Sequence, residues 1–145
     1  MFIGIDPGKS GAIAIVDGTG LYVASLRLSC TESDVAEFFA TYIQYEDMVA
    51  YIERVHSMPR QGVASSFKFG MNYGFLRGML IAFKVPFEEV GPAVWQGKMS
   101  CRSGGDKNVT KARAQQLFPA VKITHANADA LLIAEYGRRK RKGEL

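Results

Sequence analysis

The chain has 145 residues and a mass of 15.9 kDa, with 48% hydrophobic and 22% charged residues, a composition typical of an ordinary globular domain. A domain of this size folds without disulfides or a structural metal, and its two cysteines, which form no CxxC pair, cannot build a tetrahedral metal site. No apolar run approaches the roughly 18 residues of a membrane span, so we expect a cytoplasmic protein without a membrane partner.

Charge is unevenly distributed along the chain. Residues 1–54 contain three basic and eight acidic residues, whereas residues 55–122 contain ten basic and three acidic ones. The last segment, residues 138–145, adds five basic residues and one acidic residue, which accounts for the net charge of +4. A basic middle and a basic end favour a polyanion as partner, although a solvated basic face is the simpler alternative.

The first third of the chain has the pattern of β-strands. Apolar residues predict strands over 2–5, 11–16 and 21–28, and the segment Asp17–Gly20 predicts a hairpin turn between the last two. Thr31, followed by acidic residues, then predicts the start of a helix that ends at about Gln44.

The rest of the chain alternates between strands and helices. Short apolar runs predict two strands, at 48–55 and 86–90. Helical spacing predicts three helices, at 65–83, 110–117 and 126–136. Trp95 is expected to anchor a short helix against the core. This order predicts an α/β fold with a mixed β-sheet, in which the first three strands are antiparallel and the later ones parallel, flanked by helices.

Three carboxylates fall at positions where a charge has no obvious structural role. Asp6 ends the first strand, Glu53 ends the apolar run 49–52, and Asp129 opens an otherwise apolar helix. Buried carboxylates are costly unless they are paired, so these three either meet bases or share a cation. Together they predict a divalent-metal site, because Mg²⁺ prefers a few carboxylate oxygens.

Two of these acids have a simpler explanation. Asp129 fits the first turn of a helix, where the helix dipole favours an acid, and Glu53 could pair with the neighbouring Arg54.

The chain resembles the RuvC-like Holliday-junction resolvases, especially the compact phage forms, over nearly its whole length. The resemblance rests on three acid-bearing motifs and on several further segments: Ile3-Gly4-Ile5-Asp6-Pro7-Gly8 with Gly11, Ile52-Glu53, Ala128-Asp129-Ala130-Leu131, Pro59-Arg60-Gln61-Gly62, Ser66-Phe67-Lys68-Phe69-Gly70, Val90-Gly91-Pro92-Ala93-Val94-Trp95, Lys107 and Leu117-Phe118-Pro119.

This resemblance implies a ribonuclease H-like nuclease domain over residues 1–137, followed by a basic C-terminal tail, 138–145. It implies a homodimer that resolves four-way DNA junctions by paired symmetric nicks. It also implies that Asp6, Glu53 and Asp129 bind two Mg²⁺ ions, for which Mn²⁺ would substitute, with no nucleotide cofactor.

The chain departs from the family pattern near its last acid. Many members have an acid or a histidine three residues before that acid, where this chain has Ala126. His125 lies four residues before Asp129, on the same helix face, so we expect it to assist a metal or a water unless it is an exposed bystander. Lys107 and Lys111 are the candidates for offsetting negative charge at the scissile phosphate.

DNA contacts are expected from aromatic and basic residues of the middle and end of the chain. Phe67 is the expected probe of unpaired bases, whereas Phe69 and Tyr73 are expected to pack inward or at a dimer interface. We expect a helix stop at Gly137 and a disordered run after it. The expected phosphate contacts are Lys68, Arg77, Lys98, Arg138, Arg139, Lys140, Arg141 and Lys142.

Gly70, Gly74 and Gly78 recur at every fourth residue of one expected helix. Glycine weakens a helix by about 1 kcal/mol relative to alanine, so this register predicts a close backbone approach. The approaching element is either a partner subunit or the sheet of the same subunit.

Two other functions remain open. The first is a ribonuclease H-like nuclease that acts on other branched DNA or on RNA, since metal chemistry and phosphate contacts are common to all of these. The second is a non-catalytic junction-binding protein. Three intact carboxylates argue against the second, because a pure polyanion binder gains by losing negative charge from its binding face.

Overall fold

A mixed five-stranded sheet, in the order β3-β2-β1-β4-β5, forms the centre of the computed structural model, which describes residues 1–43, 47–55 and 62–145. β1 is antiparallel to β2, and β2 to β3, whereas β1 and β4, and β4 and β5, are parallel. The expected mixed sheet is therefore confirmed. The strands are β1 (Phe2–Asp6), β2 (Ala12–Val16), β3 (Tyr22–Arg27), β4 (Val49–Glu53) and β5 (Phe87–Val90).

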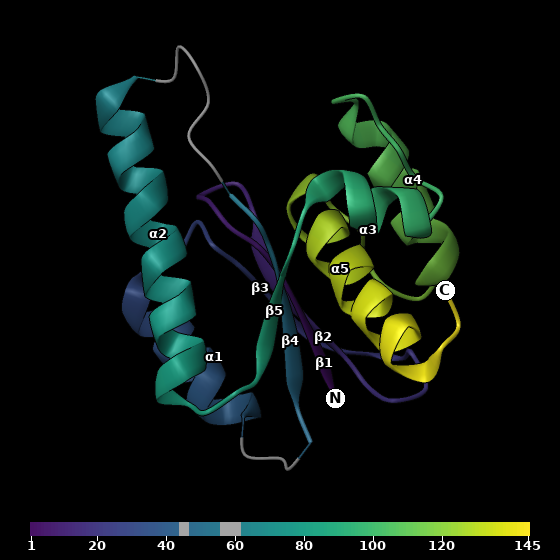
Figure 1. Ribbon diagram of the computed structural model, residues 1–145, viewed down its shortest axis with the longest axis horizontal. Helices are drawn as coiled ribbons and strands as arrows, with labels where there is room; N and C mark the ends of the chain where they lie inside the picture. Colours follow the sequence, from purple (N-terminus) through teal and green to yellow (C-terminus); the bar gives the residue numbers. More distant parts are fainter. Residues whose placement is uncertain (44–46, 56–61) are drawn as a thin grey trace.

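Helices cover both faces of this sheet (Figure 1). α1 (Glu32–Tyr42) and α2 (Val63–Ala82) lie on one face. On the other face lie α3 (Pro92–Lys98), α4 (Lys107–Leu117) and α5 (His125–Lys142). Each face has its own cluster of buried apolar residues, so the sheet separates two cores.

Local chemistry explains the first turn and the first helix. The Asp17 carboxylate accepts hydrogen bonds from the backbone N–H groups of Thr19 (2.8 Å) and Leu21 (3.0 Å), which closes the expected hairpin turn. The Thr31 side chain accepts from the Asp34 N–H, and the Asp34 carboxylate accepts from the Thr31 N–H, so a capping box starts α1. The expected end at Gln44 lies outside the described residues.

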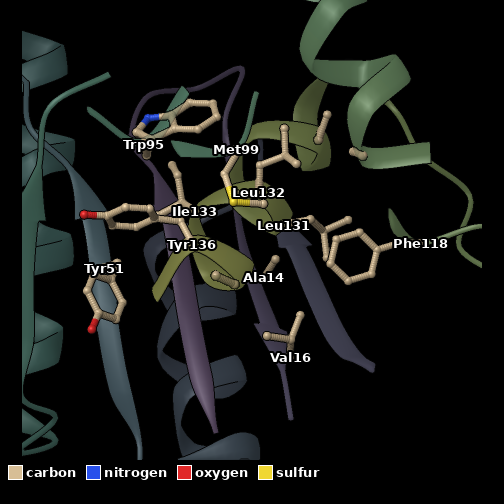
Figure 2. Packing of buried hydrophobic residues seen from close by; sticks show 14 of the residues in the cluster. Ala14, Val16, Tyr51, Trp95, Met99, Phe118, Leu131, Leu132, Ile133 and Tyr136 are labelled. Carbon is tan, nitrogen blue, oxygen red and sulfur yellow. The ribbon is translucent and has the colours of Figure 1, made fainter. Parts of the chain in front are cut away.

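α5 lies directly on β1 because β1 contains a glycine. A Cβ atom on Gly4 would lie 2.0 Å from the Ala130 carbonyl oxygen and 2.3 Å from the Ala134 nitrogen, so no larger residue fits between the two backbones. Figure 2 shows the cluster on this face, in which α5 side chains pack with Val16 of β2 and Trp95 of α3. This contact fixes α5 along β1 and brings the start of α5 to the end of β1.

The expected helix stop at Gly137 is wrong. α5 continues through Gly137 to Lys142 and ends at Gly143, which has the left-handed φ of 69°. A Cβ on Gly137 would lie 2.1 Å from the Tyr51 ring, so this glycine permits close packing and does not end the helix. Arg138, expected in a disordered tail, is buried in the described helix.

Among the described residues no helix is both long and apolar enough to cross a membrane. Cys30 is half-buried and Cys101 is buried, and both are free thiols.

Candidate active site

The structure brings the three predicted acids to one hollow of about 460 Å³. Asp6 is the last residue of β1 and Glu53 is the last residue of β4. Because β1 and β4 are parallel neighbours, their carboxyl ends meet at the same edge of the sheet. Asp129 reaches this edge from α5, whose position on β1 is set by Gly4.

The other walls of this hollow, which we call the acidic hollow, come from α3, α4 and the loop between them. Lys107 at the start of α4 is its only basic lining residue in the described chain. The loop contributes Ser103, Gly104 and Gly105, and both glycines have positive φ. Of the two expected lysines the structure therefore places Lys107 at the acids, whereas Lys111, one turn further along α4, is not among the lining residues.

Asp6 has the most perturbed carboxyl group of the site. It is 8% exposed, and burial raises its pKa to about 8, with further increases from the negative charges of Glu53 and Asp129. Lys107 opposes the shift only in part. The carboxylate of Asp6 therefore lacks a sufficient positive partner within the described chain.

Glu53 is positioned by a buried indole. The Trp95 Nε1–H, on a fully buried side chain, donates a hydrogen bond of 2.7 Å to Glu53 Oε2. Burial raises the pKa of Glu53, the indole bond lowers it and the charge of Asp129 raises it. Arg54, the simpler partner considered for Glu53, lies 3.8 Å from Glu89 instead, so that alternative is wrong.

Asp129 lies in the second turn of α5, because the helix begins at His125. The first turn of α5 contains no acid, so the helix dipole does not explain the position of Asp129. Its Oδ1 atom is buried and has no hydrogen-bond partner among the described residues. A buried carboxylate oxygen without a partner is costly, which indicates that a group outside the chain completes this site.

The acidic hollow suits a hard divalent cation. It offers oxygen ligands from three carboxylates, and both the repulsion between these acids and the unpartnered Asp129 oxygen would be relieved by positive charge. Within the described ranges no three His, Cys, Asp or Glu side chains form a ready-made ligand cluster. The acids thus surround the hollow without converging on one point.

His125 is the first residue of α5 and is exposed. It lies one turn before Asp129 but is not among the residues that line the acidic hollow.

On α2 the exposed Phe67 shares a helix face with Gly70, Gly74 and Gly78, because these residues are spaced three or four apart, whereas Phe69 lies on another face. Phe67 is 69% exposed, as a probe of DNA requires, whereas Phe69 is half-buried. A Cβ on Gly70, Gly74 or Gly78 would meet no atom within 4 Å. Close packing of this glycine face on the sheet of the same subunit is therefore ruled out for the described residues.

Most of the cations expected to contact DNA on α2 and in the last turns of α5 form ion pairs with acids of the same chain. Arg77 lies 3.1 Å from Glu89, and its guanidinium stacks near the rings of Tyr73 and Phe87. Lys98, at the end of α3, is exposed. In the last helical turns Arg138 and Arg139 bind Glu135, and Lys140 binds Glu88.

Sequence reasoning missed two features of this region. The bond from Trp95 to Glu53 joins residues on different elements, and no local pattern signals it. Lys9 and Arg27 line a second hollow that also contains Asp6. The signal for Lys9 was its place three residues after Asp6, in the loop that ends β1.

Comparisons with known proteins bear on the fold. Neither the protein-family models nor the curated proteins include a match to this chain. Among solved structures, Thermus thermophilus RuvC in complex with a Holliday junction substrate has 18% identity and a TM-score of 0.66, covering 98% of this chain and 95% of that chain. A second Thermus thermophilus RuvC structure has 17% identity and a TM-score of 0.63, over 98% of this chain and 96% of that chain. The chain therefore has the ribonuclease H-like fold of RuvC, as expected.

Proposed function

We propose that this protein is a RuvC-like endonuclease that resolves four-way DNA junctions by paired symmetric nicks. The observation that carries the proposal is the meeting of Asp6, Glu53 and Asp129 at one hollow, at the carboxyl ends of two parallel strands. The likeness in fold to a protein solved with a Holliday junction substrate supports this choice of DNA.

In this proposal Asp6, Glu53 and Asp129 hold the divalent cations. Two bound Mg²⁺ or Mn²⁺ ions would supply an activated water and stabilise the leaving 3′ oxygen of the phosphodiester. Trp95 holds one oxygen of Glu53, which fixes the orientation of that carboxylate at the hollow. Lys107 faces the same hollow and offsets the negative charge that develops on the phosphate. Lys111 and His125 are proposed to assist from the neighbouring turns.

We assign the DNA surface to exposed residues outside the lining of this hollow, first of all Phe67 and Lys68 of α2 and Lys98 of α3. In the last turns of α5, Arg141 and Lys142 are exposed and form no ion pair with a described residue. These two are the stronger candidates for phosphate contacts among the five basic residues there.

The outer face of α2 supports a homodimer. Gly70, Gly74 and Gly78 lie beside open space, and exposed apolar residues of the same helix flank them, among them Val63 (87% exposed) and Ile81 (63%). Glycines allow two helix backbones to approach closely, and the apolar flanks gain from burial. A two-fold dimer supplies two active sites for two symmetric nicks.

Cleavage of synthetic substrates tests the enzymatic proposal. The wild-type protein in Mg²⁺ should cut a four-way junction at paired positions and at a far higher rate than duplex, flap or RNA–DNA hybrid. Asp129→Asn serves as the inactive control and should still bind the junction. Preferential cutting of flap or hybrid would favour another ribonuclease H-like nuclease, and junction binding without cleavage by the wild type would favour a structural binder.

A charged residue on the glycine face tests the dimer. Gly74→Arg should give a monomer by sedimentation at micromolar concentration and should uncouple the two nicks. Gly18→Arg is the matched control, because Gly18 lies in the exposed hairpin turn and also faces open space. A wild-type monomer, with and without junction DNA, would contradict the dimer.

A further inference from the structure

Three neighbouring hollows, each sharing lining residues with the next, lie in a row at the end of the sheet. The acidic hollow shares Asp6 and Lys107 with a second hollow of about 600 Å³, which the loop after β1 and the end of β3 also line. The second hollow shares Gly8, Lys9 and Phe69 with a third of about 400 Å³, which extends along α2. We call the second and third hollows together the side groove.

The charge of the lining changes sign along this path. Three acids and one lysine line the acidic hollow. The second hollow contains only one acid, Asp6, against Lys9, Arg27 and Lys107. The third contains no acid among its described lining residues and has two lysines, Lys9 and Lys68. A ligand that follows this row therefore passes from a site for cations to a site for anions.

The cations of the side groove are available to a ligand. Lys9, Arg27 and Lys68 are exposed, and none of them forms an ion pair with any residue that the structure describes. Arg54 and Arg77, by contrast, both bind Glu89. A guanidinium and an ammonium that line one hollow suit phosphate oxygens, which accept charge-assisted hydrogen bonds from both.

The loop that carries Lys9 is held in place from two sides. The Gly8 N–H donates a hydrogen bond of 2.8 Å to Asn72 Oδ1 of α2, and the Gly11 N–H donates to the Gly8 carbonyl at 3.0 Å. Gly8 has a φ of 105°, and a Cβ there would lie 2.7 Å from the Phe69 ring. A loop whose backbone is already fixed needs no further ordering when Lys9 binds a ligand, which favours a built site.

Arg27 is positioned by the sheet. It is the last residue of β3 and pairs in register with Ala12, the first residue of β2, which follows the Lys9 loop. The two cations thus come to one hollow from a loop and from the neighbouring strand.

We infer that the side groove binds the backbone phosphates next to the scissile phosphate on the cleaved DNA strand, with Lys9 and Arg27 as the principal ligands. This inference rests on the proposed function, which places the scissile phosphate at the acidic hollow. The strand then continues past Lys107 into the side groove, where each further phosphate meets positive charge. Phosphate contacts of this kind set the register of the strand without reading its bases.

The experiment measures how junction affinity depends on salt. Lys9→Ala and Arg27→Ala, singly and together, are compared with wild type on a four-way junction in Ca²⁺. Each lost phosphate contact should reduce the slope of log affinity against log salt by about 1, and the double variant should reduce it by about 2. Lys122→Ala is the matched control, since Lys122 is exposed and lies outside the three hollows.

A neutral methylphosphonate locates the contact on the DNA. Placed next to the cut position, it should weaken wild-type binding by about tenfold, in line with the loss of one charge-assisted contact, and leave the double variant nearly unaffected. Arg27→Lys, which keeps the charge, should retain most of the wild-type slope. Wild-type melting temperatures for the alanine variants, together with the slope of Arg27→Lys, would show that a phosphate contact and not the fold has been lost.

The outcomes distinguish the two proposals. A wild-type protein that shows no preference for the junction over duplex overturns the proposed function. A wild type that binds and cuts the junction, with an unchanged salt slope in the folded double variant, overturns the side groove alone.

Discussion

Both ends of α5 contain buried charges, but those at one end are paired with cations and those at the other are not. At the C-terminal end Glu135 is 5% exposed, and its carboxylate accepts from Arg138 at 2.7 Å and from Arg139 at 2.6 Å. At the N-terminal end the Asp129 Oδ1 atom is buried without a partner, beside Asp6, which is 8% exposed. Both ends lie on one helix, which packs closely on β1 at Gly4 and on Tyr51 of β4 at Gly137.

Under the proposed function, this difference separates a structural charge from a functional one. A buried acid that the chain supplies with cations fixes the geometry around it, and its partners are already in the fold. A buried acid without such a partner raises the free energy of the folded state, and the chain retains it at a site that an external cation completes. The lack of partners for its buried acids, more than their burial, is therefore what distinguishes the acidic hollow, the proposed active site, from the Glu135 cluster.

Gly4→Ala should displace α5 and so disrupt the buried charges at both of its ends, and it has the largest expected effect. The added methyl would lie 2.0 Å from a carbonyl oxygen of α5, and neither backbone can yield without moving the helix. We expect a loss of more than about 4 kcal/mol of stability, or no soluble folded protein, in urea unfolding. Gly18→Ala adds the same methyl into open space and should change stability by less than about 1 kcal/mol. A Gly4→Ala protein as stable as wild type would contradict the contact.

Asp6→Asn should remove activity and increase stability. Cleavage of the junction in single-turnover conditions should fall by at least about 10³-fold, roughly 4 kcal/mol in the barrier. Glu53→Gln and Asp129→Asn should do the same, while Glu37→Gln, on the exposed surface of α1, should cut normally. Near-normal cleavage by any of the first three variants would remove that residue from the site.

The stability gain of Asp6→Asn should depend on pH. The pKa of Asp6 is about 8 in the fold against an ordinary 3.8, so between these values the native state binds a proton that the unfolded chain has released. The free energy of unfolding of metal-free wild type should therefore contain a component that falls as pH rises from about 4 to 8. In EDTA, Asp6→Asn should lack that component and should melt above wild type at pH 8. Mg²⁺ should narrow the gap by stabilising wild type alone.

Arg138→Met tests the paired end and should cost about 2–3 kcal/mol of stability in urea unfolding. The guanidinium also binds Glu144 at 2.8 Å, and its removal leaves the buried Glu135 with Arg139 as its remaining described partner. Lys142→Met, an exposed position on the same helix, should cost less than about 0.5 kcal/mol. An equal effect of the two variants would show that the Glu135 cluster is dispensable.

Local pattern was sufficient for the acids and insufficient for the end of α5. Asp6, Glu53 and Asp129 each interrupt or end an apolar run, and parallel strands bring such ends together. Gly137 looks like a helix stop from sequence because glycine often ends helices. Its contact with Tyr51 crosses from α5 to β4, and no spacing along the chain encodes a contact between such distant residues.

The bond between Trp95 and Glu53 is beyond local pattern for the same reason, since α3 and β4 are separate elements. The mixed sheet, by contrast, follows from the order of short apolar runs, because consecutive strands joined by a tight turn must be antiparallel. Local sequence pattern does not indicate which side chains of different elements contact one another across the core.

His125→Ala has the smallest expected effect and sharpens the comparison at the unpaired end of α5. His125 is exposed at the first position of the helix, one turn before Asp129, so its imidazole is free to turn toward a metal or water held by the acids. We expect the alanine variant to lose at least about tenfold in single-turnover cleavage, or about 1.4 kcal/mol. His125→Asp, which restores the acid common in the family that this chain resembles, should keep most of the rate. Because the side chain is exposed, both variants should have the melting temperature of wild type. A wild-type cleavage rate for His125→Ala would show that this histidine has no role and that the carboxylates alone make up the site at this end of α5.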